Sequence, residues 1–165
     1  MTADLFLTHV AFYVVGAIAL VGALIAVTQP NLLRAALGLI LAFVGVAGVY
    51  FVLEAEFVGV VQILIYIGAI SVLILFAVML TRGLMRGGEA FNTQWVGAAF
   101  IAVLMFAILL FVIVGTKWNV VAQKVSGDLI PKIGTELMTT YLLPFEAISL
   151  LLLAALVGAI VIARE

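Results

Sequence analysis

Residues 61–80, with the sequence VQILIYIGAISVLILFAVML, decide the fold class, because they form an uncharged run as long as a membrane crossing. A helix of about 20 residues spans the hydrocarbon core of a bilayer, which is about 30 Å thick. The first eleven residues of the run nevertheless contain Gln62, Tyr66, Gly68 and Ser71. Polar side chains inside a span are energetically costly and usually mark a functional face. We therefore expect the functional residues of the chain in this segment.

The composition of the whole chain agrees with a membrane protein. Of its 165 residues, 68% are hydrophobic and 9% are charged, whereas soluble domains are about half apolar and a quarter charged. We predict an all-α integral membrane protein whose residues 1–165 form a single membrane domain. The formal net charge of −1 gives no basic footprint for nucleic acid. With no cysteine and one histidine, the chain by itself offers none of the usual ligand sets for haem, iron–sulfur clusters or zinc. We expect no catalytic, cofactor-binding or metal-binding residue in this chain.

Apolar runs bounded by charged and turn residues predict five transmembrane helices, at about residues 5–27, 32–53, 57–80, 95–115 and 142–163. Pro30 ends the first helix, and Asn31 is suited to cap the second. Only residues 54–56 separate the second and third spans, so these two are expected to be antiparallel neighbours. A long loop is predicted at 116–141, with a short surface helix at 130–140.

The charged residues at the ends of the spans predict an orientation in the membrane. Four arginines fall at ends that share one side: Arg34, Arg82, Arg86 and Arg164. The opposite short ends, around Asp4 and Glu54, carry no basic residue. Basic residues in short loops favour the cytoplasmic side. We therefore place the N-terminus outside and the C-terminus inside.

Small residues recur at helical spacing in two of the spans. The stripe on the second span consists of Ala35, Gly38, Ala42 and Gly45, and the stripe on the fifth consists of Ala147, Ala154 and Gly158. Small residues allow membrane helices to approach closely. The alternative is that they reflect only the high glycine and alanine content of membrane helices.

The third span carries unusual residues on two sides. At about 100° per residue, one face of a regular helix holds Gly59, Gln62, Tyr66 and Ala69. Near the opposite face lie Gly68 and Ser71. We therefore expect a helix sandwiched between neighbours. Glycine favours a wider turn, and single wide turns cluster at functional sites.

The polar groups of this span have both a functional and a structural interpretation. The Tyr66 hydroxyl is suited to hold a water molecule, and the Gln62 amide to order water or to bond a neighbouring helix. The structural alternative is close packing with satisfied hydrogen bonds.

Three carboxylates outside the apolar runs remain. Glu54 and Glu56 lie in a helix–helix turn, where a solvated side chain is expected. Glu146 follows Pro144 and is predicted in the first turn of the fifth helix, where the helix dipole stabilises an anion. Its alternatives are a simple dipole or interface partner, a proton-path group, or a contact with another subunit.

Two blocks carry a resemblance to a known family. VQILIYIGAISVLILFAVML, preceded by LEAEFVG, resembles the third helix of the J-subunit family of proton-translocating NADH–quinone oxidoreductase, respiratory complex I. This family includes the mitochondrial NADH dehydrogenase subunit 6. YLLPFEAISLLLLAALVGAIVIARE is similar to the family's final helix. The resemblance implies a redox-driven proton pump in which FMN, iron–sulfur clusters and quinone lie on other subunits. It also implies partners homologous to chains A, H and K, and a multi-pass location in the inner (plasma) membrane of a bacterium.

The resemblance further implies a π-bulge near Tyr66 and Gly68 whose conversion to α-helix gates a water path for protons. The predicted gating set is Gly59, Gln62, Tyr66, Gly68 and Ser71. Some family members carry a carboxylate at the position of Gln62, so here we expect water ordering and not direct protonation. Two alternatives stay open: a structural membrane scaffold, and a subunit of a cation/proton antiporter or of a related ferredoxin-dependent complex.

Overall fold

The computed structural model describes residues 2–81, 94–118 and 129–164, and the side chains from residue 5 onward. Two compact units, residues 1–115 and 116–165, make up the chain. Arg82 and Arg86 lie outside the described residues, so the predicted orientation stays a prediction, as does the single domain. The first unit contains α1 (Thr2–Thr28), α2 (Leu32–Val52), α3 (Glu56–Val61), the π-helix η1 (Gln62–Ile70), α4 (Ser71–Thr81) and α5 (Trp95–Gly115). The second contains α6 (Leu129–Met138) and α7 (Leu142–Ala163).

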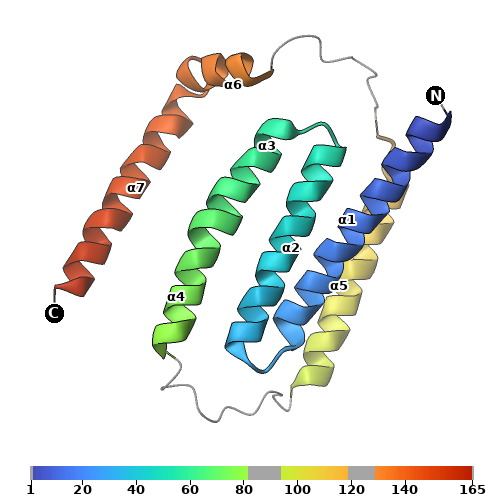
Figure 1. Cartoon of the computed structure of the whole chain (residues 1–165), viewed down its shortest axis with the longest axis horizontal. Coiled ribbons are helices and arrows are strands. Elements are labelled where there is room, and N and C mark those ends of the chain that lie inside the picture. Colours follow the sequence, from blue (N-terminus) through green and yellow to red (C-terminus); the bar gives the residue numbers. More distant parts are fainter. Residues whose placement is uncertain (1, 82–93, 119–128, 165) are drawn as a thin grey trace. The chain divides into compact units, whose positions relative to one another are not determined.

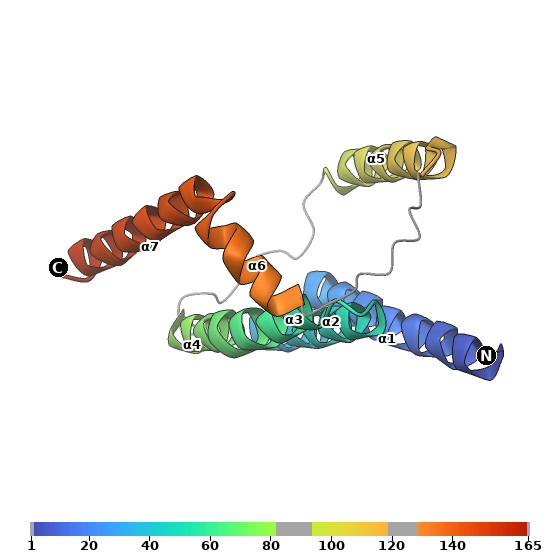
Figure 2. The same ribbon diagram turned by 90° about the horizontal axis from the view of Figure 1, so that it is seen from above.

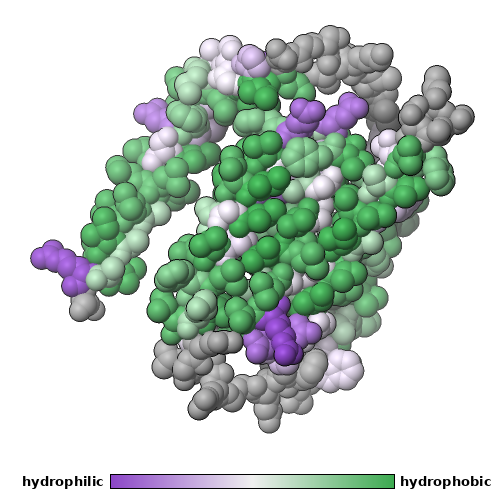
Figure 3. Space-filling model, in the orientation of Figure 1, coloured by the Kyte–Doolittle hydropathy of each residue, from purple (hydrophilic) through white to green (hydrophobic). Residues whose placement is uncertain are grey.

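The prediction of five membrane-crossing helices is confirmed. The helical segments long and apolar enough to cross a bilayer are Leu5–Thr28, Leu32–Val52, Glu56–Thr81, Trp95–Gly115 and Leu142–Ala163. The third segment combines α3, η1 and α4 into one continuous helical span. Apolar side chains cover most of the visible length of the spans, and hydrophilic residues gather at their ends (Figure 3), as burial in hydrocarbon requires.

Helix α2 is the centre of the first unit, because α1 packs on one side of it and the third span on the other (Figures 1 and 2). The turn before α2 has the predicted cap, in which the Asn31 side-chain oxygen accepts a hydrogen bond from the Leu33 N–H at 3.0 Å. Together these helices form one layer of three adjacent spans. The site described below lies on the third of them.

The small-residue stripe of α2 is where α1 approaches closely. Gly38, Ala42 and Gly45 are buried. A Cβ atom built on Gly38 would lie 2.7 Å from the backbone nitrogen of Ala26, and one built on Gly45 would overlap the backbone of Ala19. Glycine is therefore required for this spacing, and the stripe predicted on the second span packs helices. The stripe predicted on the fifth span buries none of its residues within the described chain.

A tight turn joins α2 to the third span. The Ala55 N–H bonds the Tyr50 carbonyl at 2.9 Å, and the Glu54 N–H bonds the Phe51 carbonyl at 3.1 Å. These two bonds form a Schellman motif, which places one residue in the left-handed conformation. That residue is Glu54, with a φ of 58°. Glycine normally occupies this position, because a side chain there costs about 1–2 kcal/mol.

The second unit begins with a short amphipathic helix. Helix α6 confirms the surface helix predicted near 130–140. A turn at 139–141 follows it, and the Tyr141 N–H bonds the Glu136 carbonyl at 2.8 Å. Helix α7 then starts at Leu142 and buries none of its residues within the described chain. The same is true of α5 in the first unit.

Candidate functional site

The third span is a regular helix only at its two ends. Between α3 and α4, residues Gln62–Ile70 form a π-helix, in which each N–H bonds the carbonyl five residues earlier. The last of these bonds joins the Ser71 N–H to the Tyr66 carbonyl. Isoleucine at several positions lowers the propensity of this segment for a regular helix, and Gly68 adds backbone freedom. The structure thus contains the wide turn implied at Tyr66 and Gly68, extended over nine residues.

The wide turn changes which residues face α2, so the predicted faces are partly wrong. A regular helix places Ala69 on the side of Gln62 and Ser71 on the opposite side. In the structure Ala69 is exposed, whereas Gln62 is 7% and Ser71 is 2% exposed. A π-helix advances by about 80° per residue instead of 100°, so the nine steps from Gln62 to Ser71 make two full turns. Gln62 and Ser71 therefore share one side, and within the first unit the third span packs against α2.

The amide of Gln62 is the unusual polar group of this site. It is buried, yet its side chain makes no hydrogen bond to any described residue. The described part of the chain holds no polar side-chain atom that is both sealed and unpaired, so the amide keeps a small opening. A buried amide without a partner is destabilising by about 1–3 kcal/mol unless water or another chain supplies one. The predicted bond to a neighbouring helix is thus not made within this part of the chain, and the amide is free to bind a water molecule.

Two aromatic residues of α2 contact Gly59 and Tyr66, which lie on either side of Gln62 in the sequence. A Cβ atom built on Gly59 would lie 3.1 Å from the Phe51 ring, so Gly59 gives that ring its space. The Tyr66 ring meets the Phe43 ring edge to face, with centroids 5.3 Å apart. Tyr66 is 42% exposed, and its hydroxyl makes no hydrogen bond to a described residue. The ring is therefore held by packing while the hydroxyl is available to a water molecule or a partner.

Gly68 lies on the exposed side of the span. The nearest atom to a Cβ built on it is the Ile63 carbonyl oxygen at 3.4 Å, which is an ordinary contact distance. Close packing within the chain therefore does not require glycine at this position. Its contribution is the conformational freedom of the backbone within the π-helix.

Three candidate carboxylates lie outside the π-helix. Glu54, Glu56 and Glu146 are all exposed in the described chain. Glu56 occupies the first turn of α3, where the helix dipole stabilises an anion. The prediction that Glu146 lies in the first turn of its helix is wrong, because α7 starts at Leu142 and Pro144 occupies its first turn. Proline fits there because the first N–H groups of a helix lack partners in any case.

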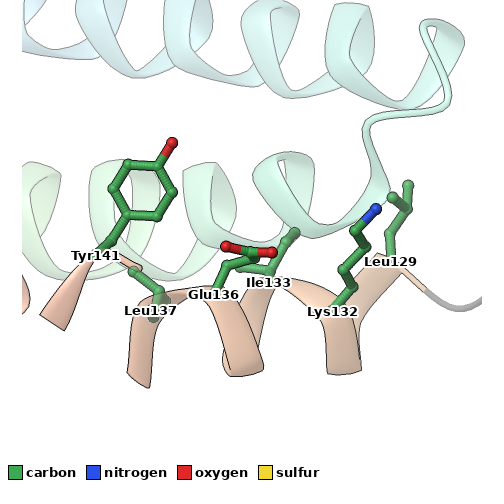
Figure 4. Close-up of a pocket in the computed structure, with 6 residues that line it drawn as sticks. All are labelled: Leu129, Lys132, Ile133, Glu136, Leu137 and Tyr141. Atoms are coloured by element: carbon green, nitrogen blue, oxygen red, sulfur yellow. The ribbon is translucent and has the colours of Figure 1, made fainter. Parts of the chain in front are cut away.

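A second feature is a groove of about 360 Å³ along α6. Five side chains on one side of the helix and one from the turn that follows it line the groove (Figure 4): Leu129, Lys132, Ile133, Glu136, Leu137 and, from the turn, Tyr141. Apolar residues at intervals of four alternate with the stems of Lys132 and Glu136, as in helices that lie at a membrane surface. Nothing in this groove resembles a catalytic arrangement.

The third span offers a polar row, Gln62, Tyr66 and Ser71, that can hold water. These residues carry amide and hydroxyl groups, which both donate and accept hydrogen bonds. The sequence analysis did not identify Phe43 and Phe51, which support this row. The short turn at residues 54–56 could have indicated them, because it makes α2 and the third span antiparallel and so fixes which residues of the two helices lie opposite each other.

Comparison with known proteins agrees with the resemblance. The family model described as NADH-ubiquinone/plastoquinone oxidoreductase chain 6 matches residues 22–162. The F(420)H(2) dehydrogenase subunit J of Methanosarcina mazei is 42% identical over 147 residues, covering 86% of this chain and 82% of the relative. The NAD(P)H-quinone oxidoreductase chain 6 of Leptolyngbya boryana is 39% identical over 162 residues, covering 94% and 79%. The chloroplastic subunit 6 of Adiantum capillus-veneris is 39% identical over 158 residues, covering 88% and 79%.

Proposed function

Because the chain belongs to the NADH-ubiquinone/plastoquinone oxidoreductase chain 6 family, we propose that its third span gates the water path that couples quinone reduction to proton translocation. Members of this family are membrane-arm subunits of complex I-like enzymes. The protein is therefore a multi-pass membrane subunit of an oxidoreductase complex, and the other subunits of that complex are its partners. The gating role and its residues are the proposal.

The unpartnered amide of Gln62 next to a π-helix carries this proposal. A buried amide that lacks a hydrogen bond takes up water readily, and a π-helix has a regular α-helix as a close alternative. In the observed structure of Gln62–Ile70, each backbone N–H bonds the carbonyl five residues earlier, and we call this the wide register. In the regular register, each N–H would bond the carbonyl four residues earlier, as in an α-helix. Changing from one to the other rotates the residues that follow Gln62, and so makes or breaks a chain of water molecules beside it. Gln62, Tyr66 and Ser71 contact the path, while Gly59 and Gly68 allow the helix to adopt both registers.

We further propose that this chain carries no redox centre and that FMN, the iron–sulfur clusters and quinone lie on other subunits. Relatives of similar identity are named for different electron donors, F(420)H(2) in one case and NAD(P)H in others. A subunit that bound the donor would be expected to differ between such enzymes. The chain is about equally similar to the subunits of both kinds of enzyme, which supports a role in the membrane that does not depend on the electron donor.

The finer assignments follow from the same resemblance. We propose the subunits homologous to chains A, H and K as the immediate neighbours, and the inner membrane of a bacterium as the location. With the N-terminus outside and the C-terminus inside, the Glu54 turn faces the outer side. Glu54, Glu56 and Glu146 are proposed as contacts with neighbouring subunits, since all three are exposed in the described chain.

A scaffold role is the second candidate, because α5 and α7 bury no residue within the described chain. Such helices suit a role in holding neighbouring subunits together. A scaffold predicts that substitutions in the third span act through assembly, whereas a gate predicts that they act on turnover in an assembled complex.

The experiment compares Gln62→Leu and Tyr66→Phe with Ile63→Leu, a change of an exposed neighbour, in the purified complex. We expect Gln62→Leu to slow proton translocation by about fivefold for each hydrogen bond of about 1 kcal/mol removed from the path. Tyr66→Phe keeps the ring contact with Phe43 and should give a smaller decrease. Wild-type turnover and pumping in both assembled variants would reject the gate. Loss of activity only in proportion to lost assembly would favour the scaffold.

A further inference from the structure

The hydroxyl of Ser71 marks the end of the wide register. It donates a hydrogen bond to the Tyr66 carbonyl at 2.6 Å, five residues earlier, and the backbone N–H of Ser71 bonds the same carbonyl. Other serine and threonine hydroxyls in the described helices, or directly after one, bond the carbonyl four residues earlier. These are Thr28 to Leu24, Thr81 to Ala77, Thr135 to Pro131, Thr139 to Thr135 and Ser149 to Phe145. The hydroxyl and the backbone N–H of Ser71 thus share one acceptor, the carbonyl five residues earlier, which is the acceptor that the wide register requires.

Among the residues that the structure describes, Ser71 also has the most completely buried side chain, at 2% exposure. The third span runs antiparallel to α2, with Gly59 at Phe51 and Tyr66 at Phe43. Continuing this order brings Ser71 toward the end of α2 that holds Ala36, which is itself 6% exposed. A small side chain fits this contact, and its hydroxyl needs no partner on α2 because the Tyr66 carbonyl accepts its proton.

The regular register would bring a different small residue to the α2 side. Seven steps of 100° return to nearly the starting direction, so Ala69 would then lie on the side of Gln62. In the wide register the corresponding residue is Ser71, nine steps away, and Ala69 is exposed. The two registers therefore exchange Ala69 and Ser71 at the surface of α2.

We propose that Ser71 and Ala69 are positioning residues that select the register of the third span, because each occupies the contact with α2 in one register only. The effect of these residues on proton translocation rests on the proposed gate. Their effect on the register can be observed separately, in the structure of the third span. A larger side chain at Ser71 is excluded by α2 in the wide register and tolerated in the regular one. A larger side chain at Ala69 has the opposite effect.

The test introduces Ser71→Val and Ala69→Val separately into the assembled complex and determines the register of the third span by electron cryo-microscopy. Overpacking of a close contact should change the ratio of wide to regular register by about five- to 150-fold. We expect Ser71→Val to lower this ratio and Ala69→Val to raise it. Ser149→Val is the matched control, because it removes a hydroxyl-to-carbonyl bond from a regular helix, and it should leave the third span in the wide register.

Opposite shifts from two residues so close together cannot arise from a general loss of stability. Ser71→Thr keeps the hydroxyl and adds one methyl group, so it provides a milder variant with the same expected direction if Ser71→Val does not assemble. An unchanged wide register in Ser71→Val or Ser71→Thr would overturn the assignment. The proton-to-electron ratio is measured on the same samples. A variant in the regular register that pumps normally would support the role of Ser71 while rejecting the gate.

Discussion

Replacing Gly38 by alanine should force α1 and α2 apart. A Cβ atom at this position would lie 2.7 Å from both the backbone nitrogen of Ala26 and the Cγ2 of Ile25, and 3.0 Å from the Cβ of Ile25. Carbon atoms in good contact are about 3.5–4.0 Å apart, so the two helices have to separate locally by about 1 Å. Ile25 can change its rotamer, but the backbone of Ala26 moves only with its helix.

A separation of this size is large enough to measure. A gap of about 0.5–1 Å removes between a quarter and a half of the attraction at each contact, and overpacking of a core typically costs about 1–3 kcal/mol. The loss falls on the interface that Gly22, Gly38 and Gly45 share, since each of them meets the opposite backbone. We expect Gly38→Ala to lower the amount of intact complex in the membrane and its temperature of dissociation.

Gly16→Ala is the matched control, because no atom lies within 4 Å of a Cβ built on Gly16 in α1. Alanine there should leave assembly unchanged or improve it slightly, since alanine favours a helix over glycine by about 1 kcal/mol. Both variants are compared on native gels and by thermal dissociation of the purified complex. Equal behaviour of Gly38→Ala and Gly16→Ala would refute the argument that glycine sets the distance between these helices.

Three further substitutions test single features of the first unit. Asn31→Ala removes the bond to the Leu33 N–H and should destabilise the start of α2 by about 1 kcal/mol, seen as faster hydrogen exchange of its first turn. Glu54→Gly relieves the left-handed backbone of Glu54 and should slow exchange at the end of α2, whereas Glu54→Gln should not. Gly68→Ala should assemble, because its Cβ has ordinary contact space, but turn over about fivefold more slowly, because alanine favours a regular helix over glycine by about 1 kcal/mol; wild-type turnover would show that the third span does not need glycine here.

Much of the topology could be predicted from the sequence because the bilayer imposes it. A span has a minimum length and must satisfy its own backbone, so apolar runs bounded by charges locate helices well. The short turns at Pro30 and Glu54 then leave little choice of neighbours for α2. The cap at Asn31 could be predicted because asparagine directly before a helix accepts a hydrogen bond from a backbone N–H of the first turn.

The orientation of side chains in the third span was harder to predict, because it depends on the number of residues per turn. Gly68 indicated a wide turn but not its length, and faces assigned at 100° per residue therefore placed Ser71 opposite Gln62. The left-handed residue at Glu54 gave no signal, because glycine is the usual marker of that conformation. The predicted start of the fifth span at residue 142 agrees with α7, but Glu146 was placed in the first turn because Pro144 does not indicate which position of that turn it occupies.

The absence of buried residues in α5 and α7 within the described chain has a consequence for biogenesis. A transmembrane helix satisfies its backbone hydrogen bonds internally, so each of these two can persist in lipid before it meets any other protein. Membrane insertion and tertiary packing are then separate events for this polypeptide. For α5 and α7, insertion needs only the translocation machinery, and packing against other helices follows as a later step.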